Sequence, residues 1–463
     1  MPEWEQTQGR LAHRIATLAL SLVLLGLLAG CSIGLGGSGG SNISLGLAGS
    51  TTDHPAPPPT LNGGPSGTLA FVYNNQIWLS KSGQSGATQL THLVLSNGAN
   101  IAWGPLMWSQ SGRYIAFALV QNFTPDVPGG TSGPVYYVDT QGGQVYVTGA
   151  TGSVYGHSYA WLGDSMLFYA TSGGILMFGP LNVPNADPRT WQALSQIRNP
   201  TGDGVTYVGN GVTYGDIAIG KGNGDLFYSL IALSSPGSSG AVGNAEVMET
   251  GLPNLDVFKQ TAAQDAANNT NNLPGWIQQN ISLSQGNQVA DLGSAYMDAS
   301  GDIVTGSWNI SPNEQKLVAQ HINSVDTKGS TVSSSICTSS YLGYFGGYSN
   351  CAPILGDAGK APLSAHLEIG VSPNGSRVAY TNGTLYIANT DGGSESKLAN
   401  AGWTTPPAWA SDNKTITPTQ LASSTTDANG VVHNATNILT FSGGSSGATF
   451  ISGGQNPSWY YGG

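Results

Sequence analysis

Residues 371–398 read VSPNGSRVAYTNGTLYIANTDGGSESKL, and this stretch decides the fold. A polar turn of Ser, Pro, Asn and Gly precedes the apolar run Val378–Tyr380. An Asn-Gly turn, a second apolar run at Leu385–Ala388 and an Asp-Gly-Gly turn at 391–393 follow. Asn-Gly and Asp-Gly between apolar runs are strong signals for β-hairpins. The stretch therefore predicts a meander of four short antiparallel strands.

The same pattern recurs along the chain. Each copy has an aromatic or apolar residue, then a polar turn, then a strand of β-branched and aromatic residues. The clear copies contain Trp108, Trp161, Trp308, Val371 and Trp409. One turn position is occupied in these copies by Ser111, Asp164, Asn313, Asn374 and Asp412. A degenerate copy lies near Tyr207–Glu249. Such repetition indicates an array of equivalent units that pack on one another.

These repeats resemble the TolB-like subclass of WD40-like β-propeller repeats. That consensus runs Trp-Ser-Pro-Asp-Gly, an Ile-Ala-Phe strand, a second strand and a Gly-Gly hairpin. The resemblance covers residues 68–463 unevenly, being good near 70–146 and 366–403 and poor from about 184 to 300. It implies an all-β fold, a β-propeller of four-stranded antiparallel blades. No copy has the full motif, and only a tether precedes the repeats, so we do not expect the Tol–Pal role of the namesake protein.

The two ends of the repeat region complement each other. The chain ends on Asn456–Trp459, which is the start of a repeat, whereas Thr68–Tyr73 is the middle of a repeat without its start. Pairing of these terminal strands would complete one blade and remove an open sheet edge. Five clear copies, the degenerate copy and this split one predict seven blades, with six or eight as alternatives.

One segment departs from the strand pattern. Leu255, Phe258, Ala262 and Ala266 recur at helical spacing, and Pro253-Asn254 can cap the start of a helix. We expect a short helix within an insertion between blades near residues 250–300. Long ordered insertions often carry function, but a lid over apolar sheet surface is the favoured interpretation.

Composition excludes some classes of protein. Charged residues make up 8% of the 463 residues, against about 25% in an average domain. The 67 glycines and 25 prolines of the chain disfavour an all-helical fold. Hydrophobic residues make up 39% of the chain, which is enough to form a core. With 14 Lys+Arg against 25 Asp+Glu, the formal net charge is -11. So acidic a chain is not expected to bind nucleic acid.

Residues 1–31 have the features of an export signal. Arg10 and Arg14 precede an apolar run from Ile15 to Gly30, which is shorter than the roughly 20 apolar residues of a spanning helix. The run ends in Leu28-Ala29-Gly30-Cys31, which resembles the lipobox of bacterial lipoproteins. The resemblance implies that Cys31 becomes the lipidated N-terminus, held on the extracytoplasmic face of the cell membrane or the outer membrane. An uncleaved helix is the alternative.

The stretch that follows predicts a flexible connection. Residues 32–67 are rich in Gly and Ser and then in Pro, and cannot bury enough apolar area to become ordered. We expect a tether at 32–67 that leads to a propeller at 68–463.

Two cysteines remain for the exported part. Cys337 and Cys351 close a short loop, and outside the cytoplasm a disulfide is the simplest expectation. A metal pair is the alternative, but no further His or Cys lies nearby. The loop carries rigid aromatic residues between glycines, a composition typical of recognition surfaces. These residues are Tyr341, Tyr344, Phe345 and Tyr348. Packing of the rings on the neighbouring blade is an equal alternative.

No motif predicts catalysis or metal binding. Gly156–Ala160 resembles the nucleophile elbow around Ser158, but the repeat at Trp161 follows where that motif needs a helix. The histidines do not pair at ligand spacing. Asp298–Asp302 has alternating oxygen ligands but lacks the closing acid of a calcium loop. We expect no cofactor.

Together these features predict a non-enzymatic, monomeric, membrane-anchored lipoprotein. Its propeller would bind a protein, peptide or glycan at the cell envelope. An extracytoplasmic polysaccharide hydrolase or lyase with carboxylates in the central channel is the alternative, because propellers host such enzymes. A purely structural envelope component is the third.

Overall fold

The computed structural model describes residues between 57 and 462. Gaps of six or more residues fall at 122–131, 196–211, 234–241, 264–286, 341–349, 354–367 and 400–405, with shorter breaks elsewhere. The predicted signal, Cys31 and most of the predicted tether lie outside the described residues. Strands dominate the described part, and none of its helical stretches is long and apolar enough to cross a membrane.

The strands form antiparallel groups, which we number as blades in chain order. Blade 1 contains β1 (Thr68–Tyr73), β2 (Gln76–Ser80), β3 (Ala87–Gln89) and β31 (Gly454–Tyr460). Blade 2 contains β4 (Ala99–Ile101), β5 (Met107–Trp108), β6 (Tyr114–Gln121), β7 (Ser132–Asp139) and β8 (Val145–Ser153). Blade 3 contains β9 (Tyr159–Leu162), β10 (Met166–Thr171), β11 (Gly174–Gly179) and β12 (Arg189–Ser195).

Blades 4 and 5 are joined in one sheet. Blade 4 contains β13 (Val212–Ile219), β14 (Leu226–Leu233), β15 (Val242–Thr250), β16 (Asn287–Met297) and β17 (Ile303–Val304). Blade 5 contains β18 (Trp308–Ile310), β19 (Lys316–Val325), β20 (Thr331–Ser340) and β21 (Asn350–Pro353). One parallel bridge, between Gly293 and Ile322, joins them. A count of seven blades depends on dividing the sheet at this bridge, so the blade number stays a prediction.

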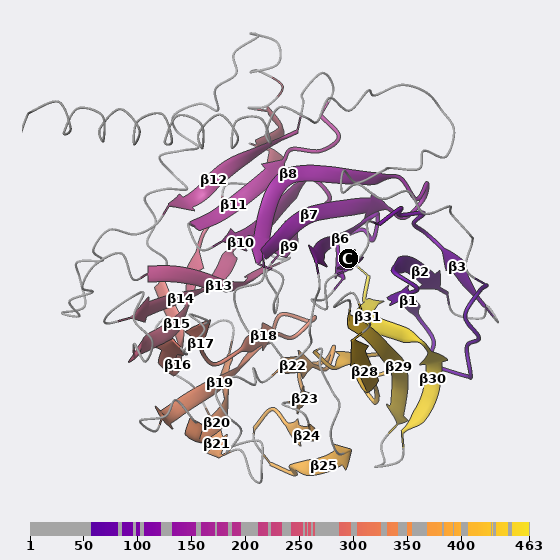
Figure 1. Cartoon of the computed structure of the whole chain (residues 1–463). Coiled ribbons are helices and arrows are strands. Elements are labelled where there is room, and N and C mark those ends of the chain that lie inside the picture. The colour runs from indigo at the N-terminus through magenta and orange to yellow at the C-terminus, as the bar shows by residue number, and fades with distance from the viewer. Residues whose placement is uncertain are drawn as a thin grey trace, which may run out of the picture.

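The last blades are separate sheets. Blade 6 contains β22 (Glu368–Val371), β23 (Arg377–Thr381), β24 (Leu385–Asn389) and β25 (Ser396–Ala399). Blade 7 contains β26 (Ala408–Trp409), β27 (Thr415–Thr417), β28 (Thr419–Thr426), β29 (Val432–Ser442) and β30 (Ala448–Ser452). Figure 1 shows the sheets arranged around a common centre. The chain is an all-β propeller, as predicted.

The circle closes through the two terminal strands. β1 pairs with β31 in antiparallel register, from Thr68 opposite Tyr460 to Tyr73 opposite Gly454. The β1 strand therefore receives its missing neighbour from the C-terminal end of the chain. This confirms the predicted closure, and it leaves no open edge on that side of β1.

In five of the blades, the repeated tryptophan ties its blade to the one before it. The indole N–H of Trp161 donates to the carbonyl of Met107, and that of Trp409 to the carbonyl of Gly370, at 3.0 and 2.9 Å. Trp108, Trp308 and Trp459 donate in the same direction, to Ser458, Ser229 and Thr417. Buried indoles need such partners. The repeat signature is thus an inter-blade contact, which explains why it recurs.

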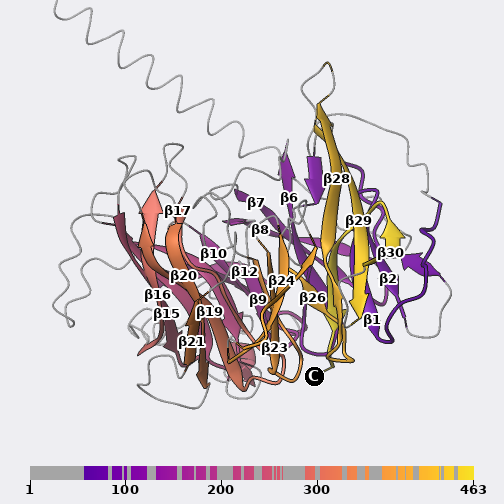
Figure 2. The same ribbon diagram turned by 90° about the horizontal axis from the view of Figure 1, so that it is seen from below.

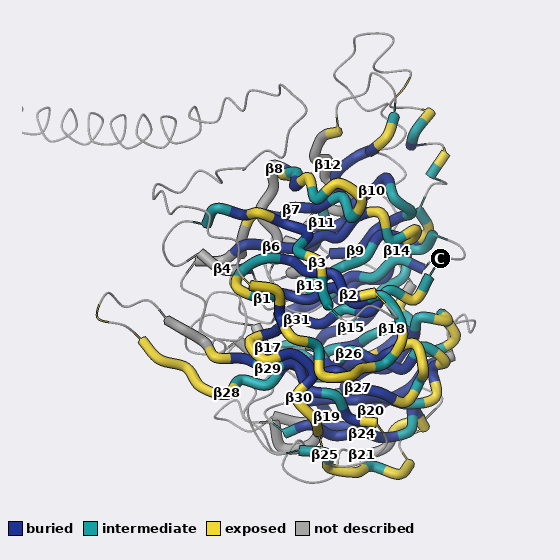
Figure 3. The backbone as a smooth tube through the Cα atoms, turned by 90° about the vertical axis from the view of Figure 1, so that its right-hand side faces the viewer, coloured by how far each residue is buried: buried dark blue, intermediate teal, exposed yellow. Residues whose placement is uncertain are grey.

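The core is divided among the spaces between blades. One cluster packs blade 3 against blade 4, another blade 2 against blade 3, and others fill the remaining spaces around the circle. Figure 3 shows the strands of the body as mostly buried. The predicted helical insertion is present at 255–256, 258–260 and 263. Its Phe258 is buried in the cluster between blades 3 and 4, which fits the lid interpretation.

A short segment ahead of β1, which we call the strap (Thr60–Asn62), joins blades 1 and 7. Thr60 bridges to Gly86 beside β3, and Leu61 bridges to Ile451 of β30. The N–H of Asn62 donates to the carbonyl of Phe450 at 3.1 Å. The strap falls within the range predicted as a tether, so the ordered chain begins before Thr68.

Candidate functional site

The disulfide-bonded hairpin of β20 and β21 forms the base of the predicted recognition loop. Cys337 and Cys351 lie directly opposite each other, with Cα atoms 4.1 Å apart, and are joined by a disulfide. Cys337 is fully buried, whereas Cys351 is exposed. The loop between the strands lies outside the described residues, and with it Tyr341, Tyr344, Phe345 and Tyr348. The structure therefore places the base of the loop and not its rings.

A buried threonine pair fixes this hairpin to blade 6. The hydroxyl of Thr338, next to Cys337, donates to the backbone carbonyl of Thr390 at the end of β24. The hydroxyl of Thr390 in turn donates to the carbonyl of Gly375, at 2.9 Å. Both threonines are buried. Buried hydroxyl groups are costly to leave without a partner, so these two hydrogen bonds resist separation of blade 5 from blade 6.

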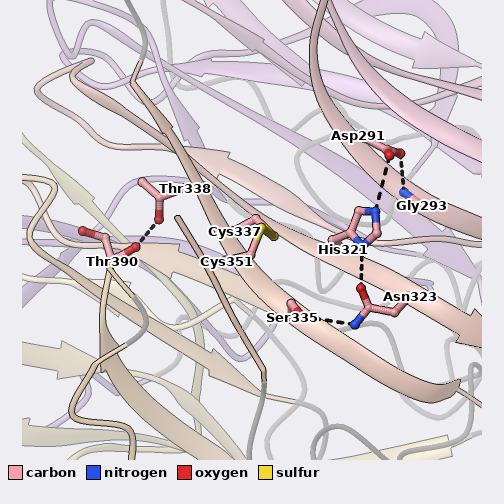
Figure 4. Close-up of a disulfide and its surroundings, with 9 residues drawn as sticks. All are labelled: Asp291, Gly293, His321, Asn323, Ser335, Cys337, Thr338, Cys351 and Thr390. Carbon is pink, nitrogen blue, oxygen red and sulfur yellow. Dashed lines mark hydrogen bonds and ion pairs between the residues drawn. A yellow bond between two sulfur atoms is a disulfide. The ribbon is translucent and has the colours of Figure 1, made fainter. Parts of the chain in front are cut away.

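A polar network holds the other side of the hairpin to blade 4 (Figure 4). His321 of β19 places its Nε2 3.4 Å from Asp291 Oδ2 and its Nδ1 2.8 Å from Asn323 Oδ1. Asn323 Nδ2 donates to the hydroxyl of Ser335 on β20, at 3.1 Å. Blades 4 and 5 are thus linked by side chains at the point where their strands bridge.

Gly293 makes this network possible. The N–H of Gly293 donates to Asp291 Oδ1 at 2.8 Å, and its φ of 73° is one that side chains with a Cβ rarely adopt. A Cβ at this position would lie 2.3 Å from the carbonyl oxygen of Ile322 and 3.1 Å from His321 Nε2. β16 can approach β19 closely only because residue 293 is glycine.

The network has the residue types of a catalytic triad in a different order. In a triad the serine hydroxyl contacts the imidazole that the aspartate orients. Here Asn323 separates the Ser335 hydroxyl from the His321 ring. The geometry holds a hairpin in place and does not prepare Ser335 as a nucleophile.

A carboxyl pair lies at the end of blade 4. Asp225 precedes β14, and Glu249 lies opposite Phe227 on β15, so both point to the same side of the sheet. Burial raises the pKa of Glu249 to about 7, and its hydrogen bond to the Asp225 carboxyl and the nearby negative charge add to the shift. The Glu249 carboxyl therefore keeps its proton to a higher pH than an ordinary glutamate does. Glycosidase carboxyls stand about 5 to 10 Å apart around a substrate, which is not the arrangement of this pair.

The variable position of the repeat turn has a structural role. Asp164 accepts hydrogen bonds from the backbone N–H and the hydroxyl of Ser111, in the turn of the preceding blade. Burial would raise the pKa of Asp164, but these bonds, a bond from Ser109 and the charge of Arg113 outweigh it, so the pKa is lowered. The turns form contacts between neighbouring blades, and they are not free acidic groups.

Sequence reasoning missed the polar network around His321. Asp291 and His321 are separated by 30 residues and share no motif. The signal that could have indicated it is the spacing of His321 and Asn323, which lie two apart on one strand and face the same way. Ser158 and Asp298–Asp302 lie outside the described residues. Within the described ranges, no group of three or more His, Cys, Asp and Glu could hold a metal ion.

The strand pairing and the inter-blade cores place the chain among β-propeller proteins. No family model matches it, and no curated protein matches its sequence. Among solved structures it is similar to TolB from Acinetobacter baumannii, at 10% identity over 86% of this chain and 68% of that chain, with a TM-score of 0.36. An α-L-arabinanase from Penicillium chrysogenum is similar at 11% identity over 71% of this chain and 87% of that one, with a TM-score of 0.34.

A third similar structure is a quinonprotein alcohol dehydrogenase-like protein from Bacteroides thetaiotaomicron. It has 9% identity over 85% of this chain and 78% of that chain, with a TM-score of 0.39. Similarity at this level carries no argument about function, and the fold rests on the contacts described above.

Proposed function

We propose that the chain is a lipid-anchored, extracytoplasmic lipoprotein whose propeller is a non-enzymatic binding or scaffolding module. Residues 1–31 supply the signal and the lipidated Cys31, and the following residues form the tether up to the strap. The partner is a protein, peptide or glycan of the cell envelope. The loop bounded by Cys337 and Cys351, with its tyrosines, supplies the contact surface.

One observation carries this proposal: the base of the loop is fixed on three sides. A disulfide closes the hairpin, Thr338 joins it to blade 6, and the network of His321 and Asn323 joins it to blade 4. A rigid base lowers the entropy lost when a loop binds its partner. Tyr side chains then give contact area at little further entropic cost.

Binding is tested with the full chain purified from its own membranes. The chain is cross-linked in place, and its partners are identified and then titrated as purified molecules. We expect Tyr344→Ala with Tyr348→Ala to weaken that binding at least tenfold. The control is Val147→Ala with Val242→Ala, at two residues exposed on other blades. Equal binding by the tyrosine variant and the wild type would exclude this loop as the surface.

Anchoring is tested separately. Cys31→Ser is expected to abolish incorporation of labelled fatty acid and to release the chain from membranes into the soluble fraction. The control is Ser32→Ala, which leaves the cysteine in place. Unchanged lipid labelling of Cys31→Ser would contradict the lipoprotein proposal while leaving the loop proposal standing.

A further inference from the structure

The hairpin of β28 and β29 extends beyond the body of the propeller. Figure 2 shows these two strands rising past the others. We call its outer part the arm, formed by Ala422–Thr426 on β28 and Val432–Ala435 on β29. All of Ala422–Thr426 is exposed, and Figure 3 shows β28 leaving the buried body at this point.

The arm is a continuation of a fixed strand. Thr419, at its base, is fully buried, and its hydroxyl accepts the backbone N–H of Asn456 at 3.0 Å. Leu421 packs against the cluster between blades 2 and 3, on another part of the circle. The strands stay paired along the arm, from Ser423 opposite Ala435 to Thr426 opposite Val432. The outer part therefore presents a formed β-ladder.

No described strand pairs with either outer edge of the arm. Among the described strands, β28 pairs only with β29, and β30 covers β29 only from Asn437 to Thr440. In an antiparallel pair, alternate residues direct their backbone N–H and C=O groups away from the partner strand. Such a row of donors and acceptors is a template for an added strand.

The edge of the arm lacks the residues that block such pairing. Soluble proteins protect edge strands with Lys, Pro or inward charges. Ala422–Thr426 reads ASSTT, without any of these, whereas the edge strand β25 of blade 6 carries an exposed Lys397. The edge of β28 is therefore open to pairing in a way that the edge of β25 is not.

Charge decides whether a second copy of the chain or a basic segment of another protein is the better partner for the edge of the arm. The whole chain has a formal net charge of -11, so a second copy would be repelled at its approach. The sequence from Thr419 to Thr440 contains the acidic Asp427 and no Lys or Arg. A basic segment is both attracted over distance and tolerated beside the hairpin.

We propose that the arm binds an extended, positively charged polypeptide segment of another protein, which adds as a β-strand along the outer edge of β28. This is a second interaction surface beyond the proposed loop.

The arm and the base of the loop lie at opposite ends of the propeller. β27 starts at the repeat turn 410–414, and β28 continues away from it, so the arm points away from those turns. β20 ends at Ser340 opposite Lys316, beside the repeat turn 311–315, so the base of the proposed loop lies at the turn end. The two surfaces can therefore be occupied together.

The test uses the full chain and a synthetic octapeptide of alternating Lys and Val, titrated by calorimetry. A second peptide has the same sequence with alternate backbone nitrogens methylated, which removes the pairing N–H groups from one edge but keeps the charge. A third replaces Lys by Glu. We expect the Lys peptide to bind, and the methylated and Glu peptides each to bind at least tenfold more weakly.

Two protein variants locate the binding. Replacement of Ser423–Ala435 by Asn-Gly removes the arm and should abolish binding. Ser424→Lys with Thr425→Lys covers both alternations of the edge and should weaken binding at least tenfold, even if the deletion fails to fold. Ser396→Lys, on the edge of β25, is the matched control and should bind normally.

Several outcomes would overturn the proposal. These are no binding of the Lys peptide, equal binding of the plain and methylated peptides, and unchanged binding by the Ser424→Lys, Thr425→Lys variant. Sedimentation of the wild type as a dimer that this variant abolishes would assign the edge to a second copy of the chain instead.

Discussion

Asp164 shows how a side chain of the repeat turn connects neighbouring blades. It belongs to the turn of blade 3 but accepts hydrogen bonds from Ser111 in the turn of blade 2. At the equivalent turn of blade 6, the N–H of Asn374 donates to Asn413 Oδ1 of blade 7, at 2.8 Å. Asn413 lies one residue after Asp412, the repeat equivalent of Asp164, and Asp412 caps its own turn instead. The turns of neighbouring blades are thus joined in the same way from either of two adjacent positions.

Asp164→Ala is expected to lower the free energy of unfolding by about 1 kcal/mol at pH 7, because a hydrogen-bonded charged acceptor is lost from a partly exposed site. The lowered pKa of Asp164 means that this stabilisation is present above the usual carboxyl pKa and is lost as the pH falls through the lowered value. Urea unfolding at pH 7 and pH 3 measures the difference. Asp391→Ala, whose carboxylate caps a turn within one blade, is the control. An equal effect at both pH values would contradict the role of the charge.

Glu249→Gln is expected to change the pH dependence of stability in the opposite sense. The pKa of Glu249 is raised to about 7, mainly by burial. The stability that the protonated carboxyl contributes is therefore fully present below the usual pKa of 4.5 and is lost as the pH rises to about 7. Gln keeps a donor for Asp225 at every pH. The melting temperature of the variant should therefore exceed that of the wild type at pH 8 and approach it at pH 4. Parallel curves across this range would contradict the raised pKa of Glu249.

At the scale of the element, the β20–β21 hairpin depends on its disulfide. Cys337→Ser with Cys351→Ser should lower the free energy of unfolding by about 3 kcal/mol on loop-closure entropy, for a sequence separation of 14. Urea unfolding with and without reductant measures it. Reductant should destabilise the wild type and leave the double variant unchanged. A wild type that is insensitive to reductant after full reduction would contradict this prediction.

Elements with a strong local pattern could be predicted from the sequence, and others could not. The strands after Trp108, Trp161 and Val371 follow the repeat, because an apolar strand after a Gly-containing turn is a local signal. The arm gave no such signal, since Ala422–Thr426 is polar on both faces and resembles a loop. The polar network of Asp291 and His321 joins blades 4 and 5, and only the tertiary fold brings its residues together.

At the scale of the whole molecule, closure of the circle should dominate stability. Truncation after Gly453 removes β31, and with it the partner of β1 and the Trp459 indole that donates to Thr417 at 2.8 Å. We expect loss of the single cooperative transition in thermal unfolding followed by circular dichroism. Trp459→Phe, which keeps an aromatic ring, is the control and should cost only about 1 kcal/mol for its hydrogen bond. A cooperative melt at the wild-type temperature after truncation would contradict the role of closure.

This closure could be predicted from two sequence fragments, because Asn456–Trp459 and Thr68–Tyr73 each lack what the other supplies. The strap could not, since Thr60–Asn62 lies in a stretch whose composition is typical of flexible chain. Its order comes from the two blades that it bridges, which are themselves placed by the closure.

The strap also determines where tension on the N-terminal side of the chain is applied. Thr60–Asn62 runs antiparallel to both β3 and β30, across the junction of the first and last blades. A pull along the strap loads its backbone bonds in shear, all at once, and not one after another as in unzipping. A pulling force from the N-terminal side would therefore reach the junction of blades 1 and 7 first. It would act along the strap, parallel to the paired strands.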